Sequence, residues 1–233
     1  MSIPKIIHYC WFGGGPINPE SRKCIESWKK YCPDYKIIEW NEQNFDISQN
    51  RYAQQAYEAK KYAFVSDYVR LAVLYRYGGI YLDTDVELVR PLDELLEHKG
   101  FIGMEHSAPS PYGRTLLVNT GSGVGAEPGC EMIGKMLAAY RNAAFIQETG
   151  EPDLCTCTQR DTPLFTKAGL QQKDEQQELD GFLVLPTDCF SPFDYVTERM
   201  HRTPRTFGIH YYQGSWQSGD KANRWRKRFK CTK

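Results

Sequence analysis

Short apolar runs alternate with stretches of helical spacing in the first third of the chain. Residues 3–9 and 35–40 have the length and composition of buried strands. Between these runs, Asn18 and Pro19 are residue types that begin helices, and Pro33 marks the end of this one. Such alternation is typical of an α/β fold. One face of the predicted helix is apolar and carries Cys24, Ile25, Trp28 and Tyr31.

A helical stretch then leads from about Arg51 into residues 63–77. Gly78 and Gly79 follow, and glycine at this place predicts a left-handed helix end. Residues 80–82 form a short apolar run that reads as a buried strand, and an acidic D-x-D sequence comes directly after it. The predicted buried face of the helix carries Ala63, Leu71, Leu74 and Tyr75.

The second half of the chain has a weaker pattern. Residues 142–177 are polar and irregular, except for a short helix that Thr162 and Pro163 are predicted to begin. Since no linker or repeat interrupts the pattern, the sequence predicts one domain over residues 1–233. A helix is predicted over 131–140, and strands are predicted over 101–104, 116–118, 181–186 and 206–212.

The composition excludes several classes of protein. The formal net charge is zero, so the overall basic charge of a nucleic-acid-binding protein is missing. No stretch approaches the ~20 apolar residues of a membrane span, and the first residues are too polar for a signal peptide. A cytoplasmic location is therefore expected. Most of the eight cysteines are expected to be free thiols, and Cys155 and Cys157 lack the second half of a zinc-binding pattern.

Asp83 and Asp85 flank Thr84 at the end of the predicted strand. Side chains at positions i and i+2 of an extended segment point the same way, so both carboxylates are expected to face one site. Paired carboxylates suit Mg²⁺ or Mn²⁺ that also binds substrate phosphates. Ligands of α/β sheets bind outside the carboxyl ends of the strands, which is where this pair falls. The alternative is an ordinary acidic turn.

Asp67 and Arg70 lie three residues apart on the preceding helix and therefore share a face. Considered alone, the two residues also fit a surface ion pair, which would contribute only ~0.3 kcal/mol to stability. Their position shortly before the D-x-D sequence makes them candidates for the same site.

The run from Ala63 to Asp85 resembles a known family. It follows the pattern A-x-x-S-D-x-x-R-x-x-x-L-x-x-x-G-G-x-Y-L-D-x-D. This pattern is similar to that of glycosyltransferase family 32, which includes capsule and lipopolysaccharide sugar transferases and yeast Golgi mannosyltransferases. It also resembles the glucosyltransferase domains of the large clostridial toxins. Residues 3–14, 119–126 and 208–216 are similar to further segments of the family. The resemblance implies an α/β fold of the GT-A type, a Rossmann-like sheet that binds nucleotide sugars.

The resemblance implies roles for particular residues. Asp67 would accept hydrogen bonds from sugar hydroxyls and Arg70 would organise the site, and these two residues with Asp85 are predicted to be catalytic. Trp11 would stack on the nucleotide base through its flat indole, although a core tryptophan is the alternative. The predicted donor-binding residues are Trp11, Asp67, Arg70, Tyr81, Asp83, Thr84, Asn119, Ser215 and Trp216.

His210 is predicted to be the third metal ligand beside Asp83 and Asp85, because imidazole suits Mn²⁺ when carboxylates share the site. The toxins carry an acidic residue in this region instead. A flexible loop with Ser215 and Trp216 would close over the donor. Taken without the resemblance, residues 119–126 are only a glycine-rich turn, and they lack the Lys-Ser/Thr ending of a P-loop.

The implied activity is metal-dependent transfer of a hexose from a nucleoside-diphosphate sugar, expected to be UDP-linked. Mn²⁺ or Mg²⁺ would neutralise charge on the departing diphosphate. The expected acceptor is a saccharide or lipid-linked saccharide in cell-surface polysaccharide synthesis, and residues 142–205 are expected to contact it. The family implies retention at the anomeric carbon, and since its motif marks no carboxylate as nucleophile, front-face substitution is the favoured route.

Residues 217–233 form a basic tail in which Trp225 and Phe229 share a face at helical spacing. The lysines and arginines of 221–230 suit contact with an anionic membrane surface, which would place the protein at the inner face of the membrane. A solvated helix that packs two aromatic side chains fits the same pattern.

Two other functional classes remain open at this stage. Leu82 to Val86 also fits the motif of phosphohydrolases with an aspartate nucleophile, although no later acidic pair with an upstream lysine is evident. The second alternative is a sugar-nucleotide-binding module without activity. Phosphate release from an aryl phosphate would indicate the first class, and donor binding without turnover would indicate the second.

Overall fold

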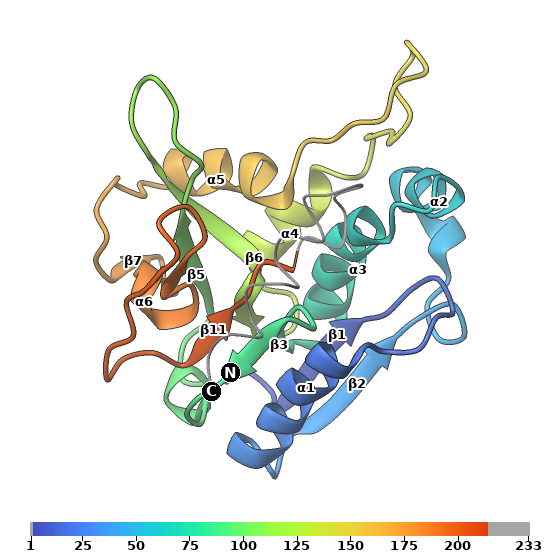
Figure 1. Cartoon of the computed structure of the whole chain (residues 1–233). Helices are drawn as coiled ribbons and strands as arrows, with labels where there is room; N and C mark the ends of the chain where they lie inside the picture. Colours follow the sequence, from blue (N-terminus) through green and yellow to red (C-terminus); the bar gives the residue numbers. More distant parts are fainter. Residues whose placement is uncertain (1, 214–233) are drawn as a thin grey trace.

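The structure, a computed structural model, describes residues 2–213, and within them a mixed β-sheet carries helices on both faces (Figure 1). Its strands lie in the spatial order β2-β1-β3-β6-β5-β8-β7. Strand β1 pairs in parallel with β2 and β3, whereas β6 runs antiparallel to both of its neighbours, β3 and β5. The sheet strands are β1 (Ile6–Cys10), β2 (Lys36–Trp40), β3 (Gly79–Tyr81), β5 (Gly100–His106), β6 (Leu116–Ala126), β7 (Gln177–Leu179) and β8 (Phe182–Leu185).

Two small antiparallel ribbons and a set of helices complete the described residues. The ribbons pair β4 (Val86–Leu88) with β11 (Gly208–His210), and β9 (Phe193–Asp194) with β10 (Arg199–Met200). The helices are α1 (Pro19–Tyr31), α2 (Arg51–Glu58), α3 (Tyr62–Tyr77), α4 (Glu131–Ala138), α5 (Cys157–Lys167) and α6 (Thr187–Phe190), with 3₁₀ turns η1 (Ile47–Gln49) and η2 (Asp93–Leu95). No helix among residues 2–213 is long and apolar enough to cross a bilayer.

A hydrophobic core fills each face of the sheet, because alternate side chains of a strand point to opposite faces. On strand β5, Ile102 belongs to the core beneath α2 to α5, and Phe101 belongs to the core that α1, α6 and the β4–β11 ribbon cover. The α/β fold class predicted from the alternating pattern is confirmed.

Helix α1 is fixed against the strand that follows the D-x-D sequence. The Asn18 side chain caps its first turn by accepting a hydrogen bond from the Ser21 amide at 2.8 Å, as the sequence predicted. Trp28 is fully buried, and its Nε1 donates to the Val86 carbonyl at 2.7 Å. Burying an indole contributes roughly 2–3 kcal/mol, so α1 is a stable support for the residues next to Asp85.

The Gly78-Gly79 pair ends α3, as predicted, although Gly78 with ψ −165° is not in the left-handed helical conformation, and β3 begins at Gly79, one residue before the predicted strand. Both residues have positive φ, 63° and 101°. A Cβ on Gly79 would lie 2.8 Å from the Ile6 carbonyl oxygen, so only glycine fits beside β1. The buried imidazole of His8 donates from Nε2 to the Gly78 carbonyl at 2.8 Å, with Nδ1 accepting from Trp40 Nε1 at 3.0 Å. This contact fixes the start of the strand that carries Asp83.

Strand β6 contains a large bulge. Its register against β5 passes from Gly103↔Asn119 to Ile102↔Val124, so residues 120–123 have no partner on β5. The strand predicted over 116–118 is confirmed as the first part of β6, whereas the glycine-rich turn predicted after it is wrong. Residues 119–126 stay in the strand because β3 pairs with 124–126, and the extra residues bulge toward the end of β3.

Three further expectations are corrected by the structure. Helix α5 does not begin at Thr162, because Thr156, six residues earlier, forms a capping box with Gln159, and Pro163 lies within the helix. Tyr75 was predicted to lie on the buried face of the long helix, but its side chain is exposed. The helical stretch from Arg51 is also divided, since α2 ends at Glu58 and α3 begins at Tyr62.

Candidate functional site

A cavity of about 1030 Å³ lies at the carboxyl ends of β1 and β3. This is the edge at which α/β sheets bind their ligands. The cavity brings together segments that are far apart in the sequence, and most of the predicted site residues line it. These lining residues are Trp11, Asp67, Arg70, Asp83, Thr84, Asp85, Asn119 and His210.

Asp83, Asp85 and His210 form a cluster within this cavity. Strand β11 pairs with β4 so that His210 lies opposite Val86, and the imidazole Nε2 is therefore 3.3 Å from Asp85 Oδ1. The Gln213 amide donates to Asp85 Oδ2 at 2.7 Å, and the Tyr211 amide donates to the Asp85 carbonyl at 3.0 Å. These contacts connect the end of the described chain to the D-x-D sequence.

The charges of this pair support each other. Burial disfavours the charged carboxylate of Asp85, but the nearby imidazole and the hydrogen bonds outweigh burial and hold its pKa below the ordinary value. Burial likewise disfavours a charged His210, and Asp85 outweighs it, so the pKa of the imidazole is raised. Each group therefore favours the charged form of the other.

The three side chains fit a divalent cation. One ligand atom from each lies within 4.8 Å of the other two, so small side-chain movements would bring all three to the bonds of about 2.1 Å that such an ion makes. His210 Nδ1 is buried without a hydrogen-bond partner among residues 2–213, so part of the ring's polar capacity is unused. Two carboxylates with one imidazole are a donor set that suits Mn²⁺. The predicted metal ligands thus come together.

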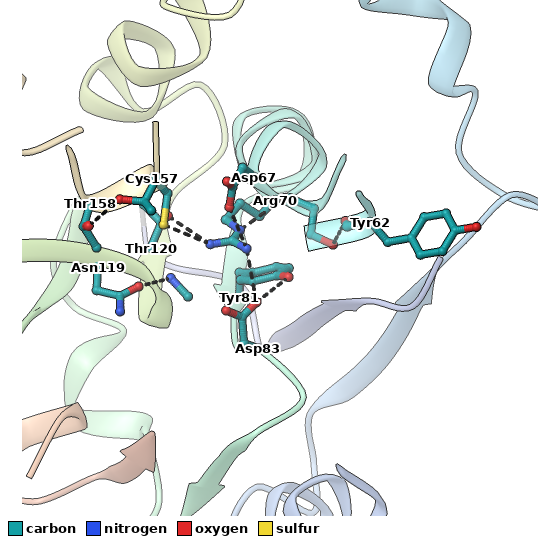
Figure 2. Close-up of polar contacts among 12 residues, drawn as sticks. Tyr62, Asp67, Arg70, Tyr81, Asp83, Asn119, Thr120, Cys157 and Thr158 are labelled. Atoms are coloured by element: carbon teal, nitrogen blue, oxygen red, sulfur yellow. Dashed lines mark hydrogen bonds and ion pairs between the residues drawn. The ribbon is translucent and has the colours of Figure 1, made fainter. Parts of the chain in front are cut away.

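Arg70 is at the centre of a second cluster, which Figure 2 shows between α3, the end of β3, and β6. Its side chain is 3% exposed, and its Nη2 lies 3.1 Å from Asp67 Oδ1 and 3.2 Å from Asp83 Oδ1. Nη1 donates to Thr120 Oγ1 at 3.2 Å and lies 3.7 Å from Cys157 Sγ. The alternative of a surface ion pair between Asp67 and Arg70 is therefore wrong, because both side chains are buried.

Asp67 is an unusual carboxylate. Burial raises its pKa to about 6, against the opposing effect of Arg70. The residue also lines the cavity, beside Arg70 and Asp83.

Asp83 is held from three sides. Tyr81 donates from its hydroxyl to Asp83 Oδ1 at 2.9 Å, and the Asp83 amide donates to the Gly121 carbonyl at 2.9 Å. A Cβ on Gly121 would lie 2.1 Å from Asp83 Oδ2, so the bulge of β6 requires glycine here. Tyr81 itself is fully buried and is not among the residues that line the cavity. Tyr81 therefore reaches the cavity only through its hydrogen bond to Asp83, and its predicted contact with a donor stays a prediction.

Of the other predicted residues, two line the cavity and the rest lie outside the described residues. Trp11 follows β1 and is half-buried, with its Nε1 donating to the Gly15 carbonyl at 2.6 Å. Thr84 lines the cavity between the two aspartates. Ser215, Trp216 and the basic tail of 217–233 lie outside the described residues. The seven cysteines among residues 2–213 are free thiols, as expected.

Several cavity residues carry no sequence signal of their own. Glu105 lies near the end of β5 and is 8% exposed, and burial raises the pKa of its carboxyl. Cys157 begins α5 and approaches Arg70. Tyr195 and Tyr212 come from loops late in the chain, with ring centroids 4.9 Å apart. These four residues reach the cavity only through tertiary packing, so periodicity and motif spacing could not identify them.

Asp161 of α5 is a buried carboxyl beside this cluster. It is fully buried, and neither of its oxygens has a hydrogen-bond partner among the described residues. Burial and the neighbouring Asp67 raise its pKa to about 8. An uncharged acid is therefore favoured in the folded protein over much of the pH range in which the unfolded chain carries the carboxylate.

We expect Asp161→Asn to stabilise the protein at pH 8 and to have little effect at pH 4. The folded carboxyl keeps its proton as the pH rises from about 4 to about 8, whereas the unfolded chain loses it, so the contribution of this group to wild-type stability falls across this range. The amide removes that dependence, and the gain at pH 8 should be on the order of a few kcal/mol. Urea unfolding at pH 4, 6 and 8 measures it.

Asp180→Asn is the matched control, because that side chain is 92% exposed and pairs only with Lys99 at 3.5 Å. It should change the free energy of unfolding by less than ~0.5 kcal/mol at each pH. A gain in stability from Asp161→Asn that does not grow from pH 4 to pH 8 would contradict the assignment.

The segment that contains the D-x-D sequence is similar to a known protein family. The family model described as "Glycosyltransferase sugar-binding region containing DXD motif" matches residues 18–102. This segment contains Asp67, Arg70 and both aspartates of the D-x-D sequence. Over these residues the chain is similar to the sugar-binding region of the DXD glycosyltransferases. The resemblance to D-x-D glycosyltransferases predicted from the sequence is thereby confirmed.

Individual relatives are glycosyltransferases of fungi. Inositol phosphoceramide mannosyltransferase 3 of Schizosaccharomyces pombe is 33% identical over 127 residues, which are 50% of this chain and 33% of that protein. Mannosyl phosphorylinositol ceramide synthase SUR1 of Saccharomyces cerevisiae is 32% identical over 111 residues, 43% of this chain and 27% of that protein. The chain thus spans about a third or less of the length of these curated relatives.

Solved structures with a similar backbone are also glycosyltransferases by name. The PaToxG glycosyltransferase matches with a TM-score of 0.49 at 24% identity, over 72% of each chain. A glycosyltransferase involved in glycosylation of the major capsid of PBCV-1 matches with a TM-score of 0.47 at 12% identity, over 96% of this chain and 98% of that one. The predicted GT-A fold agrees with the strand order and with the D-x-D sequence at the end of β3.

Proposed function

We propose that the DXD glycosyltransferase chain transfers a hexose from a nucleoside-diphosphate sugar to a hydroxyl acceptor, with a divalent cation bound by Asp83, Asp85 and His210. The observation that carries the proposal is the convergence of this metal-ligand cluster and the buried Asp67–Arg70 pair on one cavity. The first cluster suits a diphosphate with its cation, and the second offers hydrogen-bonding groups to a sugar.

The order of strands supports an arrangement of the donor along the sheet edge. Trp11 follows β1, Asp83 follows β3, and Asn119 lies on β6, and these three strands are neighbours in that order. Adjacent strands are about 4.8 Å apart. A donor would therefore extend across the edge with its base on Trp11, its diphosphate at Asp83 and Asp85, and its sugar beside Asn119.

The residues of the chain have distinct tasks in this arrangement. Asp67 accepts hydrogen bonds from sugar hydroxyls, and Arg70 keeps Asp67 and Asp83 in place while adding positive charge near the departing diphosphate. The cation, when bound, supplies Lewis-acid stabilisation of the diphosphate. Burial of this network keeps the reacting groups away from bulk water, which favours transfer over hydrolysis.

Retention at the anomeric carbon is part of the proposal, through front-face substitution in which the leaving phosphate takes the acceptor proton. The proposal also covers the base of the donor nucleotide and the identity of the acceptor. We propose a UDP-sugar and a saccharide acceptor in cell-surface polysaccharide synthesis, at the cytoplasmic face of a membrane. The names of the fungal relatives favour a second candidate, with a mannosyl donor and an inositol phosphoceramide acceptor.

A donor screen tests the proposal. The purified chain with Mn²⁺ is incubated with UDP-glucose, UDP-galactose, their N-acetyl forms or GDP-mannose, and free nucleotide is measured. We expect slow release from one donor that stops when EDTA removes the cation. Binding without release would favour the inactive module, and phosphate release from an aryl phosphate would favour the phosphohydrolase. Neither release nor calorimetric binding with any donor would overturn the proposed function.

A further inference from the structure

Glu105 is a carboxylate inside the cavity that has no task in the arrangement above. It lies near the end of β5 and lines the cavity with Asn119 and His210. A carboxylate that is 8% exposed needs hydrogen-bond donors to be tolerated. Asn119 Nδ2 donates to Glu105 Oε2 at 2.6 Å, and the Tyr212 hydroxyl is hydrogen-bonded to the same carboxylate.

The amide of Asn119 is held from both ends. Its Oδ1 accepts from the Gly121 amide at 2.7 Å and from the Ser122 amide at 3.3 Å, as part of the β6 bulge (Figure 2). Its Nδ2 donates one hydrogen to Glu105. An asparagine amide has two acceptor positions and two donor hydrogens, so one N–H remains. The network therefore determines which way the amide faces, and this N–H is the group left for a ligand.

Glu105 also contacts the segment that carries His210. Tyr212 has a φ of 50°, a conformation that costs a non-glycine residue energy, and its ring centroid is 4.1 Å from that of His210. The hydrogen bond between Tyr212 and Glu105 helps to hold this conformation. One carboxylate thus contacts both the sugar side and the metal side of the cavity.

We propose that Glu105 is a positioning residue that fixes the Asn119 amide so that its remaining N–H meets an oxygen of the donor sugar. This inference rests on the proposed function. Strand β5 is the next strand beyond β6, away from β3, so Glu105 lies on the far side of Asn119 from the D-x-D sequence. The Asn119 N–H would donate to a hydroxyl or ring oxygen of the donor sugar. A free nucleotide lacks this sugar.

A double-mutant cycle tests the inference by binding. Wild type, Glu105→Ala, Asn119→Ala and the double variant are titrated by calorimetry with UDP-glucose and GDP-mannose, and with UDP and GDP alone, each with Mn²⁺. Each single variant should weaken binding of the recognised nucleotide sugar by about tenfold. Binding of the free nucleotide should stay within about twofold, and the double variant should be no weaker than Asn119→Ala, because one residue acts through the other.

Two further variants separate positioning from damage to the fold. Glu105→Gln keeps an oxygen that accepts from Asn119 Nδ2, so it should restore most of the affinity. Glu178→Ala, an exposed carboxylate on β7, should leave all affinities unchanged.

The outcomes are distinct. Losses that multiply in the double variant, or equal losses for free nucleotide and nucleotide sugar, would overturn the role of Glu105 while leaving the proposed function intact. A wild-type protein that binds neither nucleotide nor nucleotide sugar would overturn both.

Discussion

Asp85→Asn should reduce metal-dependent donor turnover by at least ~100-fold, since a bound cation supplies several kcal/mol of transition-state stabilisation. The variant keeps an oxygen for the Gln213 amide, so the fold around β4 and β11 should persist. It removes the charge that pairs with His210 and that would bind the cation. Nucleotide release and calorimetric titration of Mn²⁺ in the presence of UDP measure the two effects.

The control for this prediction is Asp180→Asn, which alters an exposed carboxylate far along the sheet on the turn between β7 and β8. Its turnover and its Mn²⁺ affinity should match the wild type. Thermal unfolding should show that Asp85→Asn is folded. An Asp85→Asn protein that retains turnover within about threefold would remove Asp85 from the metal site.

Arg70→Met should lower the free energy of unfolding by about 3–5 kcal/mol, because removing one partner leaves a buried charge without compensation. Arg70 contacts Asp67, Asp83 and Thr120 from a position that is 3% exposed. Without the guanidinium, the pKa of Asp67, about 6 in the intact site, should rise further. The loss of stability should therefore be larger at pH 8 than at pH 5. Urea unfolding at both values measures it.

Arg76→Met is the matched control on the same helix. Arg76 is exposed and lies over the Tyr77 ring, with 5.0 Å from its guanidinium carbon to the ring centroid. Its replacement should change stability by less than ~1 kcal/mol. A similar loss for Arg70→Met and Arg76→Met would mean that the buried network contributes little to folding.

The helix ends and the D-x-D site could be predicted from the sequence, because capping residues, glycines and residue spacing act over only a few residues. Asn18 with Pro19, and Gly78 with Gly79, act through capping and backbone freedom within a few residues, and the structure shows both. The i, i+2 spacing of Asp83 and Asp85 likewise depends only on extended geometry. The predicted start of α5 was wrong because Pro163 was taken as the first helical residue. The helix in fact begins after the capping box of Thr156 and Gln159 and continues through Pro163.

The bulge of β6 shows why part of the site needed the structure. Glycines near Asn119 are compatible with a turn, and local propensity favours one. Pairing with β3 on one side and β5 on the other keeps the segment in the sheet, and the surplus residues are displaced toward Asp83. Only the three-dimensional register decides that Gly121 lies against Asp83.

By itself the sequence determined the α/β class, the D-x-D pair and the Asp67–Arg70 face, because these follow from periodicity and from spacing along a single element. The tertiary structure decided the burial of Arg70 and the entry of Glu105, Cys157 and Tyr212 into the cavity. It also decided that Asp161 is buried without a partner among the described residues. Burial and pairing between distant elements depend on how the whole sheet packs, and no local pattern records that packing.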